Sequence, residues 1–346
     1  MKIAFLTGPC PPGECGVGDY VVLLAEALNE IDVRTEIVTV HDWTIVEAIR
    51  VHRKLKEFDV VQIHYPSLGI GTKLGPQLNA LLRRSVIVLH EGSQVHILRQ
   101  LALYPFSVFP KHVVFFSEFE RRFGIRWAPW ISSITSVIPP PSNIRECEYH
   151  GPRDLNEIVA FGLIRPGRGH EQVVQLAELI KLSNAPFRIR VIGTPQSSEF
   201  VSYFDGLRAN SANLPIVWDS GLSEQQVAER LTRAAIAYLP YPDGAAELRS
   251  TLKAALLHKL AIVTTQGRHT PHNLADVVCF AQTPAEALIA IRRIQENPQL
   301  QEALSRKAAA YVKDWTWDAS ARSYARLYEH CLQPGRATTA TQIHNA

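Results

Sequence analysis

The chain has 346 residues, which at roughly 150 residues per domain corresponds to about two domains. Hydrophobic residues make up 46% and charged residues 20%, a mixture typical of globular proteins rather than of disordered or fibrous ones. The net charge of +3 is too small for a dedicated nucleic-acid-binding protein, and no apolar run approaches the roughly 18 residues of a membrane span. The first residues lack the long apolar region of a signal peptide, and the five cysteines form no CxxC pair, so we expect a cytoplasmic protein with reduced thiols.

Short apolar segments alternate with amphipathic segments through the first 145 residues. Strands are predicted at residues 2–7, 34–40, 60–64, 85–90 and 112–117, and helices at residues 19–29 and 46–58. The strands are apolar on both faces, which fits a parallel sheet covered by helices. The alternation of strand and helix predicts an α/β domain at residues 1–145.

The alternation starts again after Pro139-Pro140-Pro141 and a polar stretch, which we interpret as a linker at residues 146–156. Residues 157–318 are expected to form a second α/β domain, followed by a helix at 319–333 that returns to the first domain and a disordered tail at 334–346. The predicted fold class is therefore α/β, with two facing, Rossmann-like domains built on parallel sheets. The predicted strands are 158–161, 187–192, 215–219, 236–239, 260–265 and 277–280, and the predicted helices are 171–182, 224–234, 248–258, 284–297, 298–312 and 319–332.

Glycines and histidines follow the strands of the first domain. The segment Gly16-Val17-Gly18-Asp19 lies between the first strand and the first helix, where glycines let the backbone approach a ligand and a helix N-terminus favours anions. The alternative is a surface loop with Asp19 as the helix N-cap. His64 and His90 end two strands, and Glu91 follows His90. Ligands bind at the carboxyl ends of strands in α/β sheets, although a single histidine is more often structural.

Two segments of the second domain combine small residues with arginine. The turn Arg165-Pro166-Gly167-Arg168-Gly169 precedes a predicted helix, and two guanidinium groups beside a helix N-terminus suit a diphosphate. The segment from Tyr241 to Lys253 also leads from a strand into a helix, and we expect Arg249 and Lys253, four residues apart, to share a helix face. The alternative for both segments is a solvated basic surface. The second segment also contains Asp243, Gly244, Ser250 and Thr251.

Basic and aromatic residues are interleaved from Arg121 to Trp130. This pattern suits contact with an anionic membrane surface, in which arginine meets phosphate groups and tryptophan lies at the interface. The alternative is a helix end with partly buried tryptophan side chains.

In these residues the chain resembles the retaining glycosyltransferases with the GT-B fold, and among them the group called family 4 or glycosyl transferases group 1. The resemblance covers nearly the whole chain and rests on Pro11-Pro12 with the glycine turn, His90-Glu91, Arg168-Gly169, the block from Pro240 to Thr265, and Trp317 before the last helix. It implies that a nucleotide-sugar donor binds mainly to the C-terminal domain and the acceptor to the N-terminal domain. It also implies a reaction without a metal held by a DxD motif, and no such motif stands here.

The resemblance assigns roles to individual residues. Arg168 matches the basic residue that binds the donor diphosphate, His90 matches the strand-end histidine near the donor sugar, and Gly16 and Gly18 match the turn beside the phosphates. Leu163 stands where many members have an arginine, which Arg165 is expected to replace.

The block from Pro240 to Thr265 departs from the family pattern. The family's Glu-x7-Glu pair would fall on Ala245 and Lys253, and neither is acidic. We therefore expect Arg249, Ser250 and Thr251 to hold the phosphates instead.

The expected function is transfer of a sugar from a UDP-sugar or GDP-sugar to an acceptor hydroxyl with retention of configuration. His90 is the expected catalytic residue, and no further cofactor and no metal are expected. The acceptor is left open between a glycan, a lipid-linked saccharide and a small molecule. The alternative is a non-catalytic GT-B-like subunit that binds a nucleotide sugar or a partner. The residues expected to contact the donor sugar or the acceptor are Asp19, His64, Glu91, Asp243 and Gly244.

Overall fold

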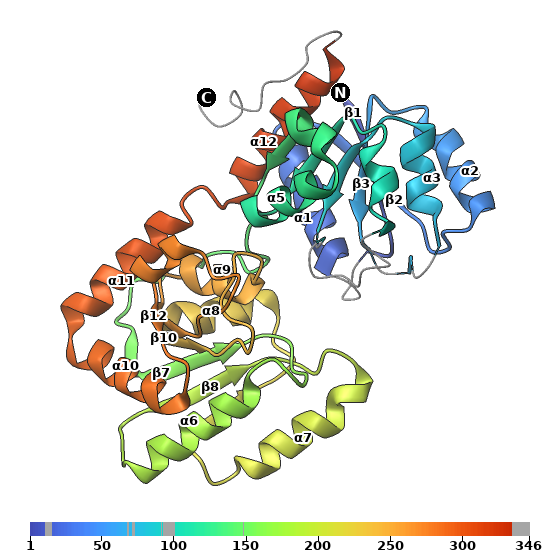
Figure 1. The fold of residues 1–346 in the computed structure, drawn as a ribbon. Helices are drawn as coiled ribbons and strands as arrows, with labels where there is room; N and C mark the ends of the chain where they lie inside the picture. Colours follow the sequence, from blue (N-terminus) through green and yellow to red (C-terminus); the bar gives the residue numbers. More distant parts are fainter. Residues whose placement is uncertain are drawn as a thin grey trace. The chain divides into compact units, whose positions relative to one another are not determined.

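The computed structural model describes residues 1–10, 16–67, 69–70, 73–90, 92, 101–147 and 149–333. The described residues form two compact units, each with its own parallel sheet (Figure 1). The first unit comprises residues 1–141 together with 315–346, and the second comprises residues 142–314. The predicted tail at 334–346 lies outside the described residues.

The sheet of the first unit has the strand order β2-β1-β3-β4-β5-β6, all parallel. Helices α1 and α12 pack together against one face, while α2 and α3 pack together on the other. The strands are β1 (Lys2–Thr7), β2 (Arg34–Thr39), β3 (Val60–Tyr65), β4 (Val86–Leu89), β5 (His112–Phe115) and β6 (Thr135–Val137). The helices are α1 (Gly16–Glu30), α2 (Ile45–Leu55), α3 (Gly75–Leu82), α5 (Glu118–Trp127) and α12 (Trp317–Leu332), with the 3-10 helices η1 (Tyr104–Ser107) and η2 (Pro129–Ile134).

The sheet of the second unit has the order β12-β11-β10-β7-β8-β9, again parallel. Its core lies between the sheet and helices α6 and α10, which pack on each other. The strands are β7 (Asp154–Phe161), β8 (Arg188–Ile192), β9 (Ile216–Asp219), β10 (Ala234–Leu239), β11 (Ala261–Thr264) and β12 (Cys279–Phe280). The helices are α6 (His170–Leu182), α7 (Val201–Asn210), α8 (Glu224–Arg233), α9 (Ser250–Leu257), α10 (Pro284–Glu296) and α11 (Pro298–Tyr311), with η3 (Ser198–Phe200) and η4 (His272–Asp276).

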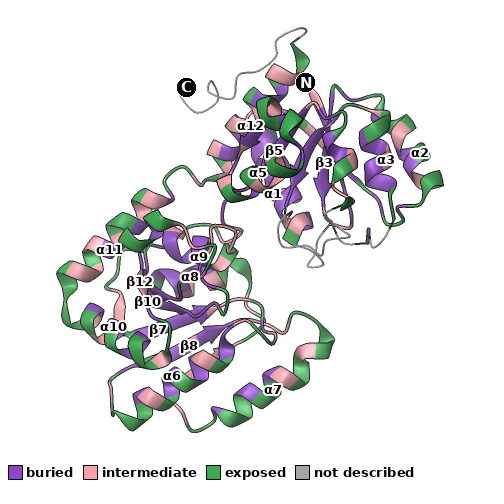
Figure 2. Ribbon diagram, in the orientation of Figure 1, coloured by how far each residue is buried: buried purple, intermediate pink, exposed green. Residues whose placement is uncertain are grey.

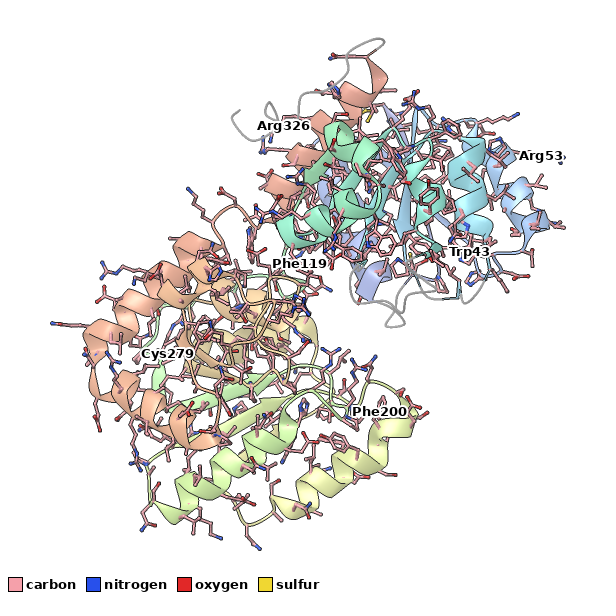
Figure 3. The ribbon with its side chains drawn as sticks, viewed as in Figure 1. Trp43, Arg53, Phe119, Phe200, Cys279 and Arg326 are labelled. Carbon is pink, nitrogen blue, oxygen red and sulfur yellow. The ribbon has the colours of Figure 1, made fainter. Side chains whose placement is uncertain are left out.

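The central strands are buried on both faces, as their composition predicts. Every residue of β3 and of β10 is buried, and in each unit purple strands lie inside a shell of pink and green helices (Figure 2). The side chains that fill and cover these cores include Trp43 of the first unit, which is only 1% exposed, and the half-exposed Phe119 (Figure 3). The predicted α/β class with two parallel sheets is confirmed.

Side-chain caps fix where several helices begin. Ser223 and Gln226 form a complete capping box at the start of α8, and the Thr283 hydroxyl accepts from the backbone N–H of Glu286 at the start of α10. A cap of this kind contributes about 1 kcal/mol. The final helix starts in the same way, with the Thr316 hydroxyl accepting from Ala319 N–H. This helix, α12, packs on α1 and β3, which confirms the prediction that it returns to the N-terminal domain.

Strand β6, helices α3, α5 and α7 and the 3-10 helices were not among the elements predicted from the sequence. Strand β6 has only three residues, which is too short for a periodic pattern. Helix α3 begins with Gly75-Pro76, and α7 buries only Phe204 and Leu207. No helix in the described part of the chain has the length and hydropathy needed to cross a membrane.

Candidate functional site

The strand orders place one topological switch point in each sheet. In the second unit the order reverses between β7 and β10, and in the first unit it reverses between β1 and β3. Open α/β sheets bind ligands beside such a point, outside the carboxyl ends of the strands. The loop after β7 carries Arg165 and Arg168, and the loop after β10 carries Asp243 and Arg249. The three arginines predicted for diphosphate binding, Arg165, Arg168 and Arg249, therefore lie at the switch point of the second sheet, whereas Gly16 and Gly18 belong to the first unit.

Glycines bring these two loops into direct contact. Gly169 has φ +85°, and a Cβ atom there would lie 1.8 Å from the carbonyl oxygen of Pro240. Gly162 has φ +141°, and its Cβ would lie 3.0 Å from Cγ2 of Thr251. A residue with a side chain at position 169 would push the two loops apart. The close approach therefore positions the start of α6 beside the loop that leads into α9.

The loop after β10 is held by polar contacts around Tyr241. The hydroxyls of Tyr241 and Thr251 lie 2.7 Å apart, and the Arg249 guanidinium lies 5.1 Å from the centre of the Tyr241 ring. Arg249 also forms an ion pair with Asp243. Burial raises the pKa of Tyr241, while the positive charges of Arg249 and Arg168 act in the opposite direction. The two guanidinium groups thus act on one ring from two different loops.

Arg165 and His170 each carry a nitrogen without a partner. The Nε of Arg165 and the Nε2 of His170 are buried and make no hydrogen bond within the described parts of the chain. His170 is the first residue of α6 and lines a small pocket together with Arg168 and Tyr241. Burial lowers the pKa of His170, so its imidazole is neutral at pH 7. The start of α6 therefore presents a neutral ring next to a cationic side chain.

The start of α9 differs from the prediction in one respect. The helix begins at Ser250, so Arg249 is its N-cap residue rather than a helical partner of Lys253. Lys253 is 3% exposed, whereas Arg249 reaches the Asp243 carboxylate, so the two do not share an exposed face. Burial lowers the pKa of Lys253 to about 7. Ala245, at the other position where the resemblance places a glutamate, is fully buried.

The glycine turn of the first unit is helical. Helix α1 begins at Gly16, so Gly16 and Gly18 lie in its first turn rather than in a loop, and Asp19 is an acidic residue of that turn rather than the N-cap. The negative charge of Asp19 in the first turn stabilises the helix by interacting with the positive end of the helix dipole. An acidic residue near a helix start is therefore expected both at an N-cap and within the first turn. Residues 11–15, with Pro11-Pro12, and Glu91 lie outside the described residues.

The two predicted histidines of the first unit form a hydrogen-bonded pair. The Nδ1 of His64 lies 3.1 Å from the Nε2 of His90, and both side chains are buried. Burial lowers the pKa of His90 to about 3 and holds the pKa of His64 well below its usual value. Tyr20 and Phe116 meet the His90 ring edge to face, with ring centres 5.4 and 4.7 Å away. Both imidazoles are therefore neutral and rigidly held at pH 7.

Four further residues of this cluster were not predicted. Gln62 on β3 lies with its Nε2 3.0 Å from Nε2 of His64, and the Tyr328 hydroxyl on α12 donates to Oε1 of Gln62 over 2.8 Å. The Tyr20 and Tyr324 hydroxyls lie 3.0 Å apart. A glutamine within the apolar strand Val60–Tyr65 was the available signal, because a buried amide requires polar partners.

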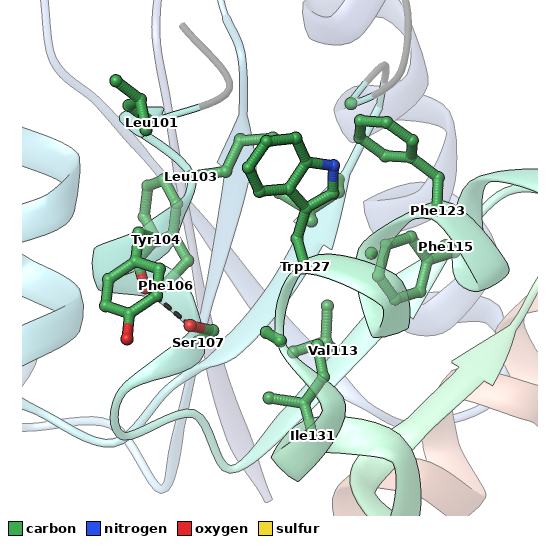
Figure 4. A pocket seen from close by; sticks show the side chains of 14 residues that line it. Leu101, Leu103, Tyr104, Phe106, Ser107, Val113, Phe115, Phe123, Trp127 and Ile131 are labelled. Atoms are coloured by element: carbon green, nitrogen blue, oxygen red, sulfur yellow. Dashed lines mark hydrogen bonds between the residues drawn. The ribbon is translucent and has the colours of Figure 1, made fainter. Parts of the chain in front are cut away.

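The segment from Arg121 to Trp130 borders an apolar pocket of the first unit (Figure 4). The pocket is lined almost entirely by carbon and lies between η1, α5 and η2. The Trp127 and Trp130 side chains are about half exposed, at 48% and 52%. Arg121 is held by Glu118 through a two-nitrogen ion pair with distances of 2.7 and 2.8 Å. These observations describe a helix end with partly exposed tryptophan side chains, and contact with a membrane stays a prediction.

Within the described residues, no three His, Cys, Asp or Glu side chains are grouped as metal ligands would be. No protein-family model matches the chain, and no curated protein matches it in sequence.

Solved structures match the fold over almost the full length. HepE of Anabaena, solved in complex with UDP, is 14% identical, and the alignment covers 95% of this chain and 100% of HepE with a TM-score of 0.72. A glycosyltransferase from Rickettsia africae is 12% identical, with coverage of 96% and 99% and a TM-score of 0.72. Sucrose-phosphate synthase from Thermosynechococcus elongatus is 13% identical, with coverage of 95% and 98% and a TM-score of 0.70. The chain therefore has the GT-B fold that these proteins share.

Proposed function

We propose that the protein is a glycosyltransferase that moves a sugar from a nucleoside diphosphate sugar to an acceptor hydroxyl. The observation that carries the proposal is the set of Arg165, Arg168 and Arg249 at the switch point of the second sheet, on a fold shared with HepE, which was solved with UDP and with UDP-glucose. Guanidinium groups bind phosphate oxygens through two parallel hydrogen bonds, which suits a diphosphate. Two helix N-termini at the same edge, those of α6 and α9, favour the same charge.

Departure of the nucleoside diphosphate creates the charge that these groups would stabilise. As the bond between the anomeric carbon and the phosphate oxygen breaks, the bonding electrons stay with the leaving phosphate, and preorganised cations there lower the barrier. Arg249 is paired with Asp243 in the ligand-free protein. Donor binding would replace this carboxylate by phosphate oxygens, while Ser250 and Thr251 supply hydroxyls and backbone N–H groups at the start of α9.

In the first unit we assign the sugar-binding role to His90, supported by His64. Both imidazoles are neutral, so we assign them no part in stabilising the negative charge of the leaving phosphate. A neutral imidazole has one donor and one acceptor nitrogen, which suits hydrogen bonding to a sugar hydroxyl. Gly16, Gly18 and Asp19 at the start of α1 would contribute backbone N–H groups and one carboxylate. The proposal includes retention of configuration, with the leaving phosphate accepting the proton of the acceptor hydroxyl. It also includes catalysis without a bound metal or further cofactor, since the sequence has no DxD motif.

The acceptor belongs to the proposal as a class of molecule: a glycan, a lipid-linked saccharide or a small molecule bearing a hydroxyl group. A second candidate is a non-catalytic subunit that binds a nucleotide sugar. It is favoured by one observation, the replacement of both expected glutamates by the buried residues Ala245 and Lys253.

A screen of UDP-sugars and GDP-sugars by thermal shift, followed by measurement of nucleoside diphosphate release, tests the proposal. A true donor at about 100 times its Kd adds roughly 2.7 kcal/mol of stability. The Arg168→Ala variant should lose the shift, while Arg306→Ala, which removes a 74% exposed arginine of the same unit, should keep it. Stabilisation without release of nucleoside diphosphate supports the non-catalytic candidate. No stabilisation by any donor contradicts both.

A further inference from the structure

A continuous line of buried polar side chains runs through the first unit from its C-terminal helix to the end of β4. We call it the Tyr328–His90 relay, and it consists of Tyr328 on α12, Gln62 and His64 on β3, and His90 directly after β4. The successive distances are 2.8 Å, 3.0 Å and 3.1 Å. Tyr328, Gln62 and His64 are at most 1% exposed, and His90 is 8% exposed. The line therefore connects the interior of the unit to a single residue at its edge.

Each link of the relay needs one donor and one acceptor, and this determines where the protons lie. The Tyr328 hydroxyl donates to Oε1 of Gln62, which turns the amide nitrogen of Gln62 towards His64. This nitrogen is a donor, so Nε2 of His64 is the acceptor and the proton of a neutral His64 lies on Nδ1. His64 Nδ1–H then donates to Nε2 of His90. A neutral His90 consequently carries its proton on Nδ1.

The remaining nitrogen of His90 is the one that the relay leaves for a ligand. Within the described residues, the His90 side chain is hydrogen-bonded through Nε2 and not through Nδ1. Tyr20 and Phe116 pack edge to face against the ring, which prevents it from turning over to exchange its two nitrogens. The pKa values of His64 and His90, lowered by burial, keep both rings neutral across the physiological range.

We propose that Gln62 and Tyr328 are positioning residues that hold His90 in its Nδ1–H form through His64, so that His90 presents a hydrogen-bond donor to a hydroxyl oxygen of a bound sugar. This inference rests on the proposed function for the identity of the ligand, but the position of the proton is a property of the ligand-free protein. It also assigns a role to the C-terminal helix α12, because this helix carries Tyr328. Tyr328 lies 266 residues from Gln62 in the sequence. The inference also excludes His90 as a general base, since Nδ1, the ring nitrogen outside the relay, already carries a proton.

Nitrogen NMR of the full-length protein labelled with 15N-histidine tests the proton positions directly. Protonated and unprotonated ring nitrogens have well-separated chemical shifts, and His90→Gln assigns the His90 signals among the 13 histidines. The expected result is a protonated Nδ1 and an unprotonated Nε2 for His90. A proton on Nε2 in the wild-type protein would mean that the Gln62 amide is reversed, and this result overturns the proposal without the need for any variant.

A double variant, Gln62→Leu with Tyr328→Phe, replaces both positioning residues by apolar side chains of similar shape and leaves one buried atom, Nε2 of His64, without its partner. We expect the His90 nitrogens to move to averaged shifts, because neither form is then selected. The KM for the sugar donor or acceptor should rise on the order of fivefold, the value of one lost hydrogen bond, while the Kd for UDP or GDP alone stays unchanged. Addition of donor and of acceptor in separate samples shows which of them shifts the Nδ1–H signal.

Unchanged His90 shifts in the double variant contradict the role of Gln62 and Tyr328. The readouts also separate this inference from the proposed function. If the protein binds no nucleotide sugar but His90 carries its proton on Nδ1 and loses this preference in the double variant, the proposed function fails and the positioning of His90 stands. If the protein binds a nucleotide sugar but the His90 shifts are the same in the wild type and in the double variant, the proposed function stands and the positioning of His90 by Gln62 and Tyr328 is wrong.

Discussion

Replacement of Gly169 by alanine tests whether the contact between the two loops of the second unit is needed. Gly169 and Gly167 lie in the same loop and both have left-handed backbone angles, φ +85° and +74°. They differ in their surroundings. A Cβ at position 169 would lie 1.8 Å from the Pro240 carbonyl oxygen, whereas a Cβ at position 167 meets nothing within 4 Å. Gly167→Ala is therefore a matched control for the cost of the backbone angle alone.

The expected magnitudes follow from these two geometries. A left-handed angle costs a residue with a Cβ about 1–2 kcal/mol, and the loss of glycine's freedom in the unfolded chain returns about 0.4–1 kcal/mol. Gly167→Ala should thus destabilise the protein by about 0–1.6 kcal/mol. Gly169→Ala must in addition move the Pro240 carbonyl by more than 1 Å, an overpacking that costs about 1–3 kcal/mol more.

Urea denaturation followed by circular dichroism measures this difference, and calorimetric titration with UDP or GDP measures its effect on the site. Because the start of α6 and the loop after β10 both carry residues proposed to bind the diphosphate, separating them should weaken nucleotide binding at least tenfold in Gly169→Ala. Gly167→Ala should bind within about twofold of the wild type. Equal stabilities and equal affinities for the two variants would refute the argument that the contact between Gly169 and Pro240 shapes the site.

Three further predictions concern titratable side chains that are buried or half-buried. Burial lowers the pKa of His90 from 6.5 to about 3, so the unfolded state binds a proton first and stability is lost as the pH falls below 6.5. The share of His90 in this loss is about 2 kcal/mol at pH 5, and urea titrations at pH 7 and 5 should show a loss smaller by that amount in His90→Gln, while an equal loss in both proteins would contradict the lowered pKa. Arg190 pairs with Glu157 at 3.0 Å and with Asp219 at 2.8 Å, and these carboxylates also pair with Arg188 and Arg230. Arg190→Ala should therefore destabilise by about 1–2 kcal/mol, and a change below about 0.5 kcal/mol would show the Arg190 pairs to be unimportant. Burial lowers the pKa of Lys253 to about 7, although the charge of Glu247 acts in the opposite direction. The unfolded state therefore binds the extra proton between pH 7 and 10, so wild-type stability should rise relative to Lys253→Met as the pH is raised from 7 to 9, and an equal change in the two proteins would contradict the lowered pKa.

Much of the architecture could be predicted because the strands of a parallel sheet are apolar on both faces. Strand β1 was predicted with its observed bounds, Lys2–Thr7, and β10 was predicted within two residues of its observed start at Ala234. Elements without a strong pattern were missed. Strand β6 is held by its pairing with β5, and that pairing depends on residues more than twenty positions away.

Part of the candidate site could also be predicted, because some of its residues lie in turns that the local sequence indicates. Turns at strand ends are local features, so Arg168 and Arg249 could be located at one sheet edge from the sequence, and the structure places both beside Tyr241. The relay could not be predicted, because it joins β3 to a helix 266 residues later. The alternative interpretation of Asp19 as an N-cap is wrong because α1 begins three residues earlier, at Gly16, and a glycine by itself does not indicate a helix start.

Calorimetric titration of the full-length protein with UDP and with GDP is the most direct test of the central claim, that the second unit binds a nucleoside diphosphate through its arginines. The account predicts saturable binding of at least one of them by the wild type and by Arg306→Ala. Arg168→Ala should weaken this binding at least tenfold, as expected for the loss of a charge-assisted hydrogen bond worth about 1.5–3 kcal/mol. Wild-type affinity in Arg168→Ala, or the absence of binding to either nucleotide in the wild type, would contradict the account.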